Sequence, residues 1–178
     1  MQVYSDSDPN RLPQLTHPPN LQRVLDRLVG NIERDNLVQQ TADQVRDALE
    51  VDRVVLYYFY RQWKGQVTFE SLSSDRFSIY GSTGPDECFN GDYARMYLEG
   101  RVRAIADIET EAIAPCHREF LRNLQVRANL VVPILTSKGL WGLLVAHHGS
   151  IRSWSHYDIE QVKSGAETLA AAPSIRES

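Results

Sequence analysis

Residues 128–135 (ANLVVPIL) and 140–148 (LWGLLVAHH) are two apolar runs joined by Thr136-Ser137-Lys138-Gly139. Each run is too short to span a membrane, and continuous apolar runs of this length are typical of strands in the middle of a sheet. Gly139 suits the tight turn of a hairpin. The stretch therefore predicts two central antiparallel strands, around which the other elements can be placed.

Amphipathic helices are predicted towards both ends of the chain. Apolar residues recur at three- and four-residue spacing over residues 21–32 and again over 37–49, as in helices with one buried face. After Trp154, residues 155–158 (SHYD) open a last helix that Pro173 ends. The core strands are thus expected to be covered by helices.

Shorter elements fill the middle of the sequence. Residues 54–59 and 66–72 read as two strands of a hairpin, with Lys64-Gly65 as the turn signal. A short strand is expected over 102–108, and a helix over 116–124. The order of helices, strands and a last helix predicts an α+β fold, an antiparallel β-sheet flanked by helices.

Residues 73–91 are rich in Ser, Gly, Asp and Pro and are expected to form a long loop, with Cys88 near its end. Loops of this length are uncommon in a compact domain unless they have a function, such as covering a site. The loop is therefore the first place to look for a binding site.

The composition favours one domain. The chain has 178 residues, of which 42% are hydrophobic, enough for a single core. We expect a flexible N-terminal tail over 1–19, the domain over 20–173 and a C-terminal tail over 174–178. The formal charge of −4 is spread along the chain, which argues against nucleic acid as a partner. We also expect no membrane span, because no apolar stretch approaches the ~20 residues that one needs.

The two cysteines, Cys88 and Cys116, come without a secretory signal. A cytoplasmic location with free thiols is therefore expected. Cys116 follows Pro115 at a predicted helix start, where the helix dipole lowers a thiol pKa and makes the thiolate more available. The alternative is a packed thiol beside a surface histidine, His117.

Several stretches together carry a family resemblance. They are residues 54–59 (VVLYYF), 85–89 (PDECF), 114–119 (APCHRE), 126–135 (VRANLVVPIL) and 140–148 (LWGLLVAHH). This set resembles the bilin-binding GAF domain of the phytochrome superfamily, and more narrowly a cyanobacteriochrome of the Asp-Xaa-Cys-Phe dual-cysteine class. The resemblance implies a GAF fold with a chromophore pocket on one face of the sheet. It also implies a light-sensing photoreceptor domain, with no enzymatic activity of its own.

The resemblance assigns roles to both cysteines. Cys116 would form a thioether to a linear tetrapyrrole, phycocyanobilin or phycoviolobilin, and His117 would pack near its central rings. Cys88 would add reversibly as a second thioether, which moves absorption towards the blue or violet. Asp86 would accept hydrogen bonds from pyrrole N–H groups.

Other pocket residues are expected around these. Tyr97 and Phe89 would stack on the bilin. We expect only one of Arg101 and Arg103 to face the pocket, and take Arg101, with Tyr97, as partner of a propionate. Of the pair His147-His148, His147 is expected to face inward, near ring D.

Signalling implies partners beyond the bilin. Light would drive Z/E isomerisation between rings C and D and bias the terminal helices, which would connect to an output signalling domain in a longer parent protein or form a homodimer. Gly84, where many red-absorbing relatives have tryptophan, speaks against that colour class.

Alternatives remain at this stage. One is a single-cysteine bilin photoswitch in which Cys88 stays unlinked, and another is a GAF module that binds a cyclic nucleotide or mediates dimerisation. A zinc site and a Cys-His hydrolase are weaker, because no CxxC, HxxxH or GxSxG spacing supports them.

Overall fold

The computed structural model describes residues 19–61, 64–84 and 91–178. Two helices, α1 (Pro19–Glu33) and α2 (Asn36–Leu49), precede the strands β1 (Arg53–Arg61) and β2 (Lys64–Leu72). A 3-10 turn η1 (Asp75–Phe77), helix α3 (Gly91–Leu98), strand β3 (Arg103–Ile105) and helix α4 (Pro115–Asn123) follow. The chain continues through β4 (Ala128–Thr136), β5 (Gly139–His148), α5 (His156–Ala171) and α6 (Pro173–Arg176).

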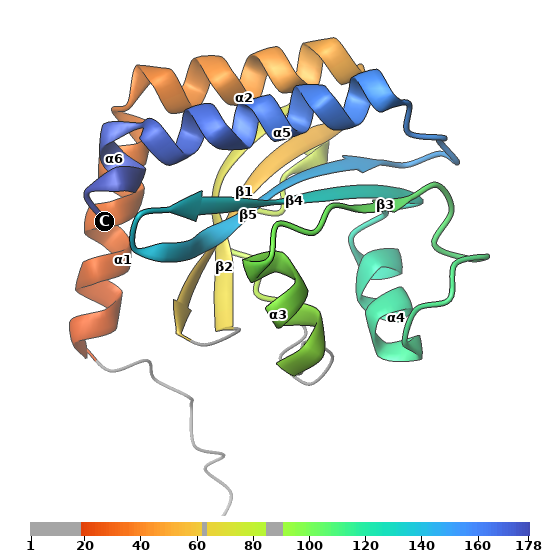
Figure 1. The fold of residues 1–178 in the computed structure, drawn as a ribbon, viewed down its shortest axis with the longest axis horizontal. Helices are drawn as coiled ribbons and strands as arrows, with labels where there is room; N and C mark the ends of the chain where they lie inside the picture. Colours follow the sequence, from red (N-terminus) through yellow and green to blue (C-terminus); the bar gives the residue numbers. More distant parts are fainter. Residues whose placement is uncertain (1–18, 62–63, 85–90) are drawn as a thin grey trace, which may run out of the picture.

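The strands form one five-stranded antiparallel sheet in the order β2-β1-β5-β4-β3. The hairpin β4–β5 lies next to β1, as expected for central strands, and Gly139 makes its turn at a φ of +114°. Helices α2 and α5 run side by side over one face, while α3 and α4 lie on the other (Figure 1). The predicted α+β architecture is therefore confirmed.

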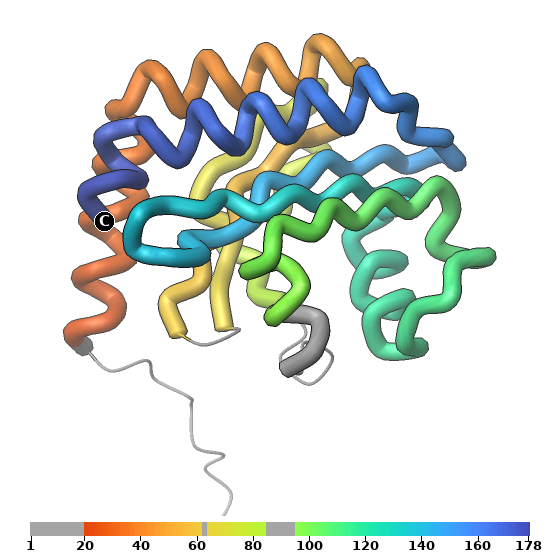
Figure 2. The backbone as a smooth tube through the Cα atoms, in the orientation of Figure 1, coloured from red at the N-terminus to blue at the C-terminus, as the bar shows by residue number. Residues whose placement is uncertain are grey.

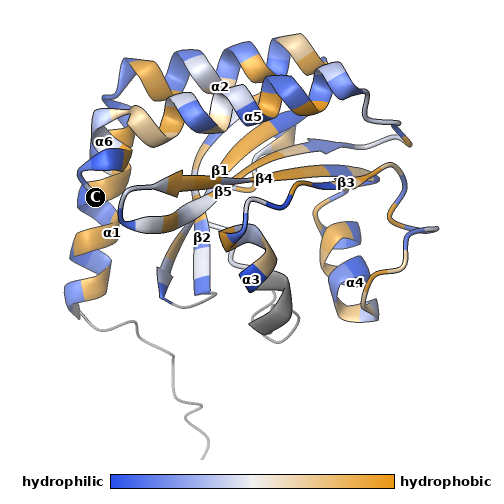
Figure 3. Ribbon diagram, viewed as in Figure 1, coloured by the Kyte–Doolittle hydropathy of each residue, from blue (hydrophilic) through white to orange (hydrophobic). Residues whose placement is uncertain are grey.

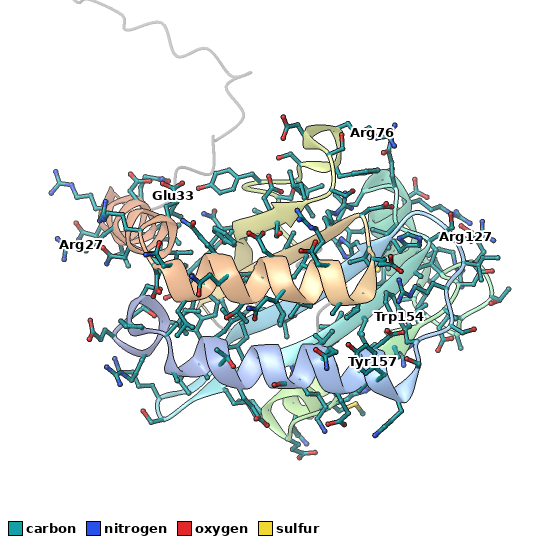
Figure 4. All side chains as sticks on the ribbon, turned by 90° about the horizontal axis from the view of Figure 1, so that it is seen from above. Arg27, Glu33, Arg76, Arg127, Trp154 and Tyr157 are labelled. Atoms are coloured by element: carbon teal, nitrogen blue, oxygen red, sulfur yellow. The ribbon has the colours of Figure 1, made fainter. Side chains whose placement is uncertain are left out.

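The core lies between the sheet and the pair α2 and α5. Val54, Leu56 and Leu144 are fully buried there, against Val162 and Leu169 of α5. The hydropathy colouring shows β1 and β4 as largely apolar strands beneath these helices (Figure 3). From above, α2 and α5 cover the sheet, with Trp154 and Tyr157 near the start of α5 (Figure 4).

Local signals explain where the covering helices begin. Asp35 caps α2 by accepting a hydrogen bond from the Leu37 amide. Ser155 and Asp158 form a reciprocal capping box at the start of α5. Both devices satisfy amide groups that the first helical turn leaves without partners.

Several element boundaries differ from the expectations. Lys64 and Gly65, predicted as a turn, belong to β2, where a Cβ at Gly65 would lie 2.2 Å from the Tyr58 carbonyl oxygen. The strand expected over 102–108 covers only Arg103–Ile105, and helix α3 was not predicted. Gly65 therefore marks a close approach between strands rather than a turn.

The predicted tails also differ. Pro19 is the first residue of α1, and Pro173 opens α6 after ending α5. Ile175 is 1% exposed within the core, and the Trp141 indole N–H donates to Ser178 Oγ at 2.7 Å. Ile175 and Ser178 thus tie this segment to the domain, and Pro173 both ends α5 and opens α6, since proline suits a first helical position as well as it ends a helix. The smooth chain trace shows this C-terminal segment beside α1 (Figure 2).

Among the described residues, no helix is both long enough and apolar enough to cross a membrane.

Candidate functional site

A cavity lies on the face of the sheet opposite α2 and α5. The sheet forms its floor, α4 and Tyr97 of α3 contribute walls, and residues 79–84 cover another side. Its volume is about 70 Å³. The lining residues are Val55, Tyr57, Val67, Ile79, Ser82, Gly84, Tyr97, Arg103, His117, Phe120, Leu121, Leu124, Asn129, Val131, Leu143, Val145 and His147.

Strand register explains which residues reach the floor. Two rows run across neighbouring strands, Arg53-His147-Asn129 and Val55-Val145-Val131-Arg103. Residues directly opposite one another on paired strands share a face, and every second residue along a strand returns to it. The floor is therefore mainly valine with a polar row along one side.

His147 lies in this polar row and is 6% exposed. The Arg53 Nε–H donates a hydrogen bond to His147 Nδ1 at 3.0 Å. Burial, and then the positive charge of Arg53, holds the pKa of His147 well below its usual value. His147 is therefore neutral around pH 7.

His117 faces the same cavity from the first turn of α4. Burial lowers the pKa of His117, and the nearby charge of Arg103 lowers it further. Arg103 itself pairs with Glu111 at 3.4 Å. Two neutral histidines, each beside an arginine, thus line one apolar cavity.

Asn129 supplies a third polar group. Its side chain is 3% exposed, and its Oδ1 has no hydrogen-bond partner in the part of the chain that the structure describes. A buried acceptor without a partner is costly and is normally explained by a ligand, an ion or water.

Tyr57 closes the side of the cavity near Gly84. Its hydroxyl accepts a hydrogen bond from the Gly84 amide at 2.6 Å and donates one to the Gly65 carbonyl at 2.9 Å. A Cβ at Gly84 would lie 2.5 Å from this hydroxyl. The tyrosine therefore occupies the space into which any side chain at position 84 would project.

Cys116 lies exposed in the first turn of α4, next to His117. It is disulfide-bonded in the structure, so the expectation of a free thiol does not hold for it. The predicted site residues Cys88, Asp86 and Phe89 lie outside the described residues.

The structure brings Tyr97, His117 and His147 together around the cavity. His148 instead places Nδ1 3.8 Å from an Asp52 carboxylate oxygen. Arg101 is not among the lining residues, whereas Arg103 is. Arg103 opposes Val131 in the sheet, and Arg101 precedes the strand. Residues two apart share a face of a strand, so the spacing gives no reason to expect only one of these arginines at the pocket; they differ because the strand begins at Arg103.

Sequence reasoning missed three polar residues of the site. They are Arg103, Arg53 and Asn129. Asn129 interrupts the otherwise apolar run of β4, whereas Arg53 and Arg103 begin β1 and β3. A polar residue in or next to an apolar strand was the available signal.

No group of three or more His, Cys, Asp or Glu side chains that could hold a metal ion occurs within the described ranges.

Comparison with known proteins identifies the family. The model of the GAF domain matches residues 33–172. An uncharacterized protein of Picosynechococcus sp. PCC 7002 is 55% identical over 151 residues, covering 85% of this chain and 93% of that protein. A putative methyl-accepting chemotaxis protein of Synechocystis sp. PCC 6803 is 36% identical over 75% of this chain, which spans only 14% of that protein.

Solved structures agree with this match. The cyanobacteriochrome receptor PixJ superposes with a TM-score of 0.68 at 31% identity, covering 83% of this chain and 93% of the other. The phycoerythrobilin-bound GAF domain of a cyanobacterial phytochrome gives a TM-score of 0.71 at 28% identity, covering 90% and 98%. The chain belongs to the GAF domain family. Its structural neighbours are bilin-binding photoreceptor GAF domains of the cyanobacteriochromes and phytochromes.

Proposed function

We propose that this chain is a photosensory GAF domain that binds a bilin covalently through Cys116. The observation that supports it most is one apolar cavity lined by neutral His117, neutral His147 and Asn129, whose Oδ1 has no hydrogen-bond partner among the described residues. A largely apolar pocket with a few placed polar groups is the usual form of a cofactor site.

The chemistry of these residues fits a bilin. Tyr97 offers an aromatic face, Asn129 Oδ1 an acceptor for an N–H group, and Arg103 a cation for a carboxylate. When bound, a bilin supplies visible-light absorption and a double bond that undergoes Z/E isomerisation. The histidines, being neutral, can each donate one hydrogen bond without adding charge.

The size of the cavity requires movement. A volume of about 70 Å³ is far below the several hundred Å³ usual for a cofactor pocket. Helix α4 packs on a small cluster of its own, built from Ile105, Ile108, Ile113, Leu121 and Val126. This cluster is separate from the core under α2 and α5, so α4 can move outward without opening that core.

Attachment at Cys116 is an addition reaction. The sulfur forms a bond to the ethylidene side chain of the bilin, the carbon–carbon π bond breaks, and the thiol proton moves to the adjacent carbon. No oxidant is needed. Because Cys116 is disulfide-bonded in the structure, a thiol reductant must first supply two electrons and two protons.

Finer features are part of the same proposal. We propose phycocyanobilin or phycoviolobilin as the bilin, a reversible second thioether from Cys88, and protonation control by Asp86. Phe89 would stack on the bilin, and Arg101 would assist a propionate near the rim. An output domain, a homodimer through the terminal helices, and a cytoplasmic location complete it.

Coexpression with bilin-synthesis enzymes under reducing conditions tests the proposal. Wild-type protein should be coloured, photoconvert, and show zinc-induced fluorescence on a denaturing gel. Cys116→Ala should lose that fluorescence, whereas the matched variant Cys88→Ser should keep it and lose only a short-wavelength state.

Three outcomes would contradict the proposal in whole or in part. An undiminished gel band in Cys116→Ala would remove Cys116 from its role. A colourless wild type that binds a cyclic nucleotide by calorimetry would favour the nucleotide-binding alternative. Unchanged spectra in Cys88→Ser would leave a single-cysteine photoswitch.

A further inference from the structure

Arg53 is a buried cation at the edge of the candidate site. It is the first residue of β1, is 3% exposed, and lies directly opposite His147 on β5. No carboxylate lies within ion-pair distance of it among the described residues. A buried arginine with no ion-pair partner is costly to maintain, which suggests a role beyond packing.

All three nitrogens of the Arg53 guanidinium donate hydrogen bonds. Nε–H donates to His147 Nδ1 at 3.0 Å, Nη1 to the Phe77 carbonyl at 2.9 Å and Nη2 to the Leu124 carbonyl at 2.5 Å. Both carbonyls fix the guanidinium group, one at the end of η1 and the other just after α4. The direction of Nε–H towards His147 is thereby set by the fold.

We propose that Arg53 is a positioning residue that holds His147 in the tautomer with its hydrogen on Nε2, so that His147 presents a donor to the cavity. The identity of the acceptor rests on the proposed function, since the terminal rings of a bilin carry carbonyl oxygens. The Nε2–H tautomer itself does not depend on a ligand and is expected in the bilin-free protein.

The tautomer follows from the chemistry of the two groups. An arginine N–H can only donate, so His147 Nδ1 must carry a lone pair. A neutral imidazole has one N–H, which then lies on Nε2. His147 lines the cavity, in the same row as Asn129, so its Nε2–H is the donor that it can offer to a ligand there.

The charges around the pair favour the neutral ring. A second positive charge beside buried Arg53 is unfavourable, and burial disfavours it further. Burial lowers the pKa of Arg53 to about 10 despite the opposing effects of Glu70 and Asp52. Arg53 therefore stays charged around pH 7, and the residue opposite His147 on β4, Asn129, is neutral.

A lysine at position 53 could not make these three hydrogen bonds. An ammonium is a compact point donor, whereas the planar guanidinium reaches three acceptors in fixed directions. Arg53 also joins His147 to the end of α4, whose first turn carries Cys116 and His117. An outward movement of α4 would thus change the contacts that orient His147.

Histidine ¹⁵N NMR on the reduced, bilin-free protein tests the tautomer directly. Two-bond ¹H–¹⁵N correlations distinguish an Nε2–H ring, an Nδ1–H ring and an imidazolium, and His147→Gln assigns the signals of His147. We expect the Nε2–H form from about one unit below to one unit above pH 6.5, the ordinary histidine pKa. An Nδ1–H ring or an imidazolium in the wild type would overturn the proposal without any Arg53 variant.

Variants then test the role of Arg53. Arg53→Lys should keep His147 neutral yet reduce the ratio of Nε2–H to Nδ1–H forms by about tenfold or more. Arg53→Gln should also raise the His147 pKa. Arg118→Lys is the matched control, since Arg118 donates to the Ile108 and Glu111 carbonyls and should leave the His147 signals unchanged. Circular dichroism checks that each variant is folded, and an unchanged tautomer ratio in a folded Arg53→Lys would refute the role.

Bilin coexpression separates this inference from the proposed function. A colourless protein with the Nε2–H tautomer would contradict the bilin assignment alone. A coloured protein whose His147 carries the hydrogen on Nδ1 would contradict the role of Arg53 alone.

Discussion

The two faces of the sheet differ in what they bury. Towards α2 and α5, the row Val54-Ala146-Leu130 and the pair Leu56-Leu144 are apolar and fully enclosed. On the opposite face, the next rows contain Arg53, His147, Asn129 and Arg103 among valines. One face therefore stabilises the domain, while the other keeps costly polar groups, which are expected where a site functions.

Packing on the two faces differs in the same way. Gly165 allows α5 to pack closely on α2 and on β5. A Cβ at this position would lie 2.8 Å from a Val45 methyl group of α2 and 3.4 Å from a Leu144 methyl group of β5. The opposite face instead leaves a cavity beneath α4. This contrast predicts that the same substitution, made at two neighbouring positions of one strand, changes the stability of the protein by different amounts.

The largest expected difference in the free energy of unfolding is between the variants Leu144→Ala and Leu143→Ala. Leu144 is fully buried under the helices, so its truncation should lower the free energy of unfolding by about 2–5 kcal/mol. Leu143 borders the cavity, so its truncation should lower the free energy of unfolding by less, and the bilin spectra should shift instead. Urea denaturation measures both, and equal losses would remove the distinction between the faces.

Replacing a buried polar residue of the cavity face by an apolar one should raise the free energy of unfolding. Asn129→Leu removes a buried acceptor that has no partner in the described part of the chain, so the free energy of unfolding should rise by about 1–3 kcal/mol while bilin binding weakens. Leu130→Asn, the neighbouring change on the covered face, should destabilise the protein. Loss of stability in Asn129→Leu would mean that Asn129 serves the fold rather than a ligand.

Lowering the pH should destabilise the protein through the two histidines of the cavity face. His147 and His117 have lowered pKa values in the folded state, so the unfolded chain binds more protons below its own histidine pKa of about 6.5. Stability should be level above pH 6.5 and fall on acidification, by up to about 1.4 kcal/mol per pH unit for each histidine. Unfolding curves across this range should show the slope, and it should be shallower in His147→Gln.

The smallest expected effect concerns the covering helix. Ser155→Ala removes one half of the α5 capping box and should cost about 1 kcal/mol. Because α5 covers the face without the cavity, thermal unfolding should shift while the bilin spectra stay the same. Ser155→Asp is the control, since aspartate also caps helices well. A spectral change in Ser155→Ala would show that the two faces are coupled.

Local and periodic signals in the sequence were enough for most of the elements. The apolar runs of β4 and β5, the spacing in α1 and α2, and the capping residues of α5 each depend on neighbours within a few positions. The family resemblance, carried by short contiguous stretches, was confirmed at the level of the GAF fold.

The polar row of the site depended on strand register instead. Arg53 and His147 are 94 positions apart and meet because β1 pairs with β5, while β4 brings Asn129 alongside. Likewise, the choice of Arg103 over Arg101 depends on where β3 begins. The sequence by itself determined the elements and the family, because helix and strand periodicity are local properties. Only the tertiary structure decided which polar groups share the cavity, since that follows from pairing between distant strands.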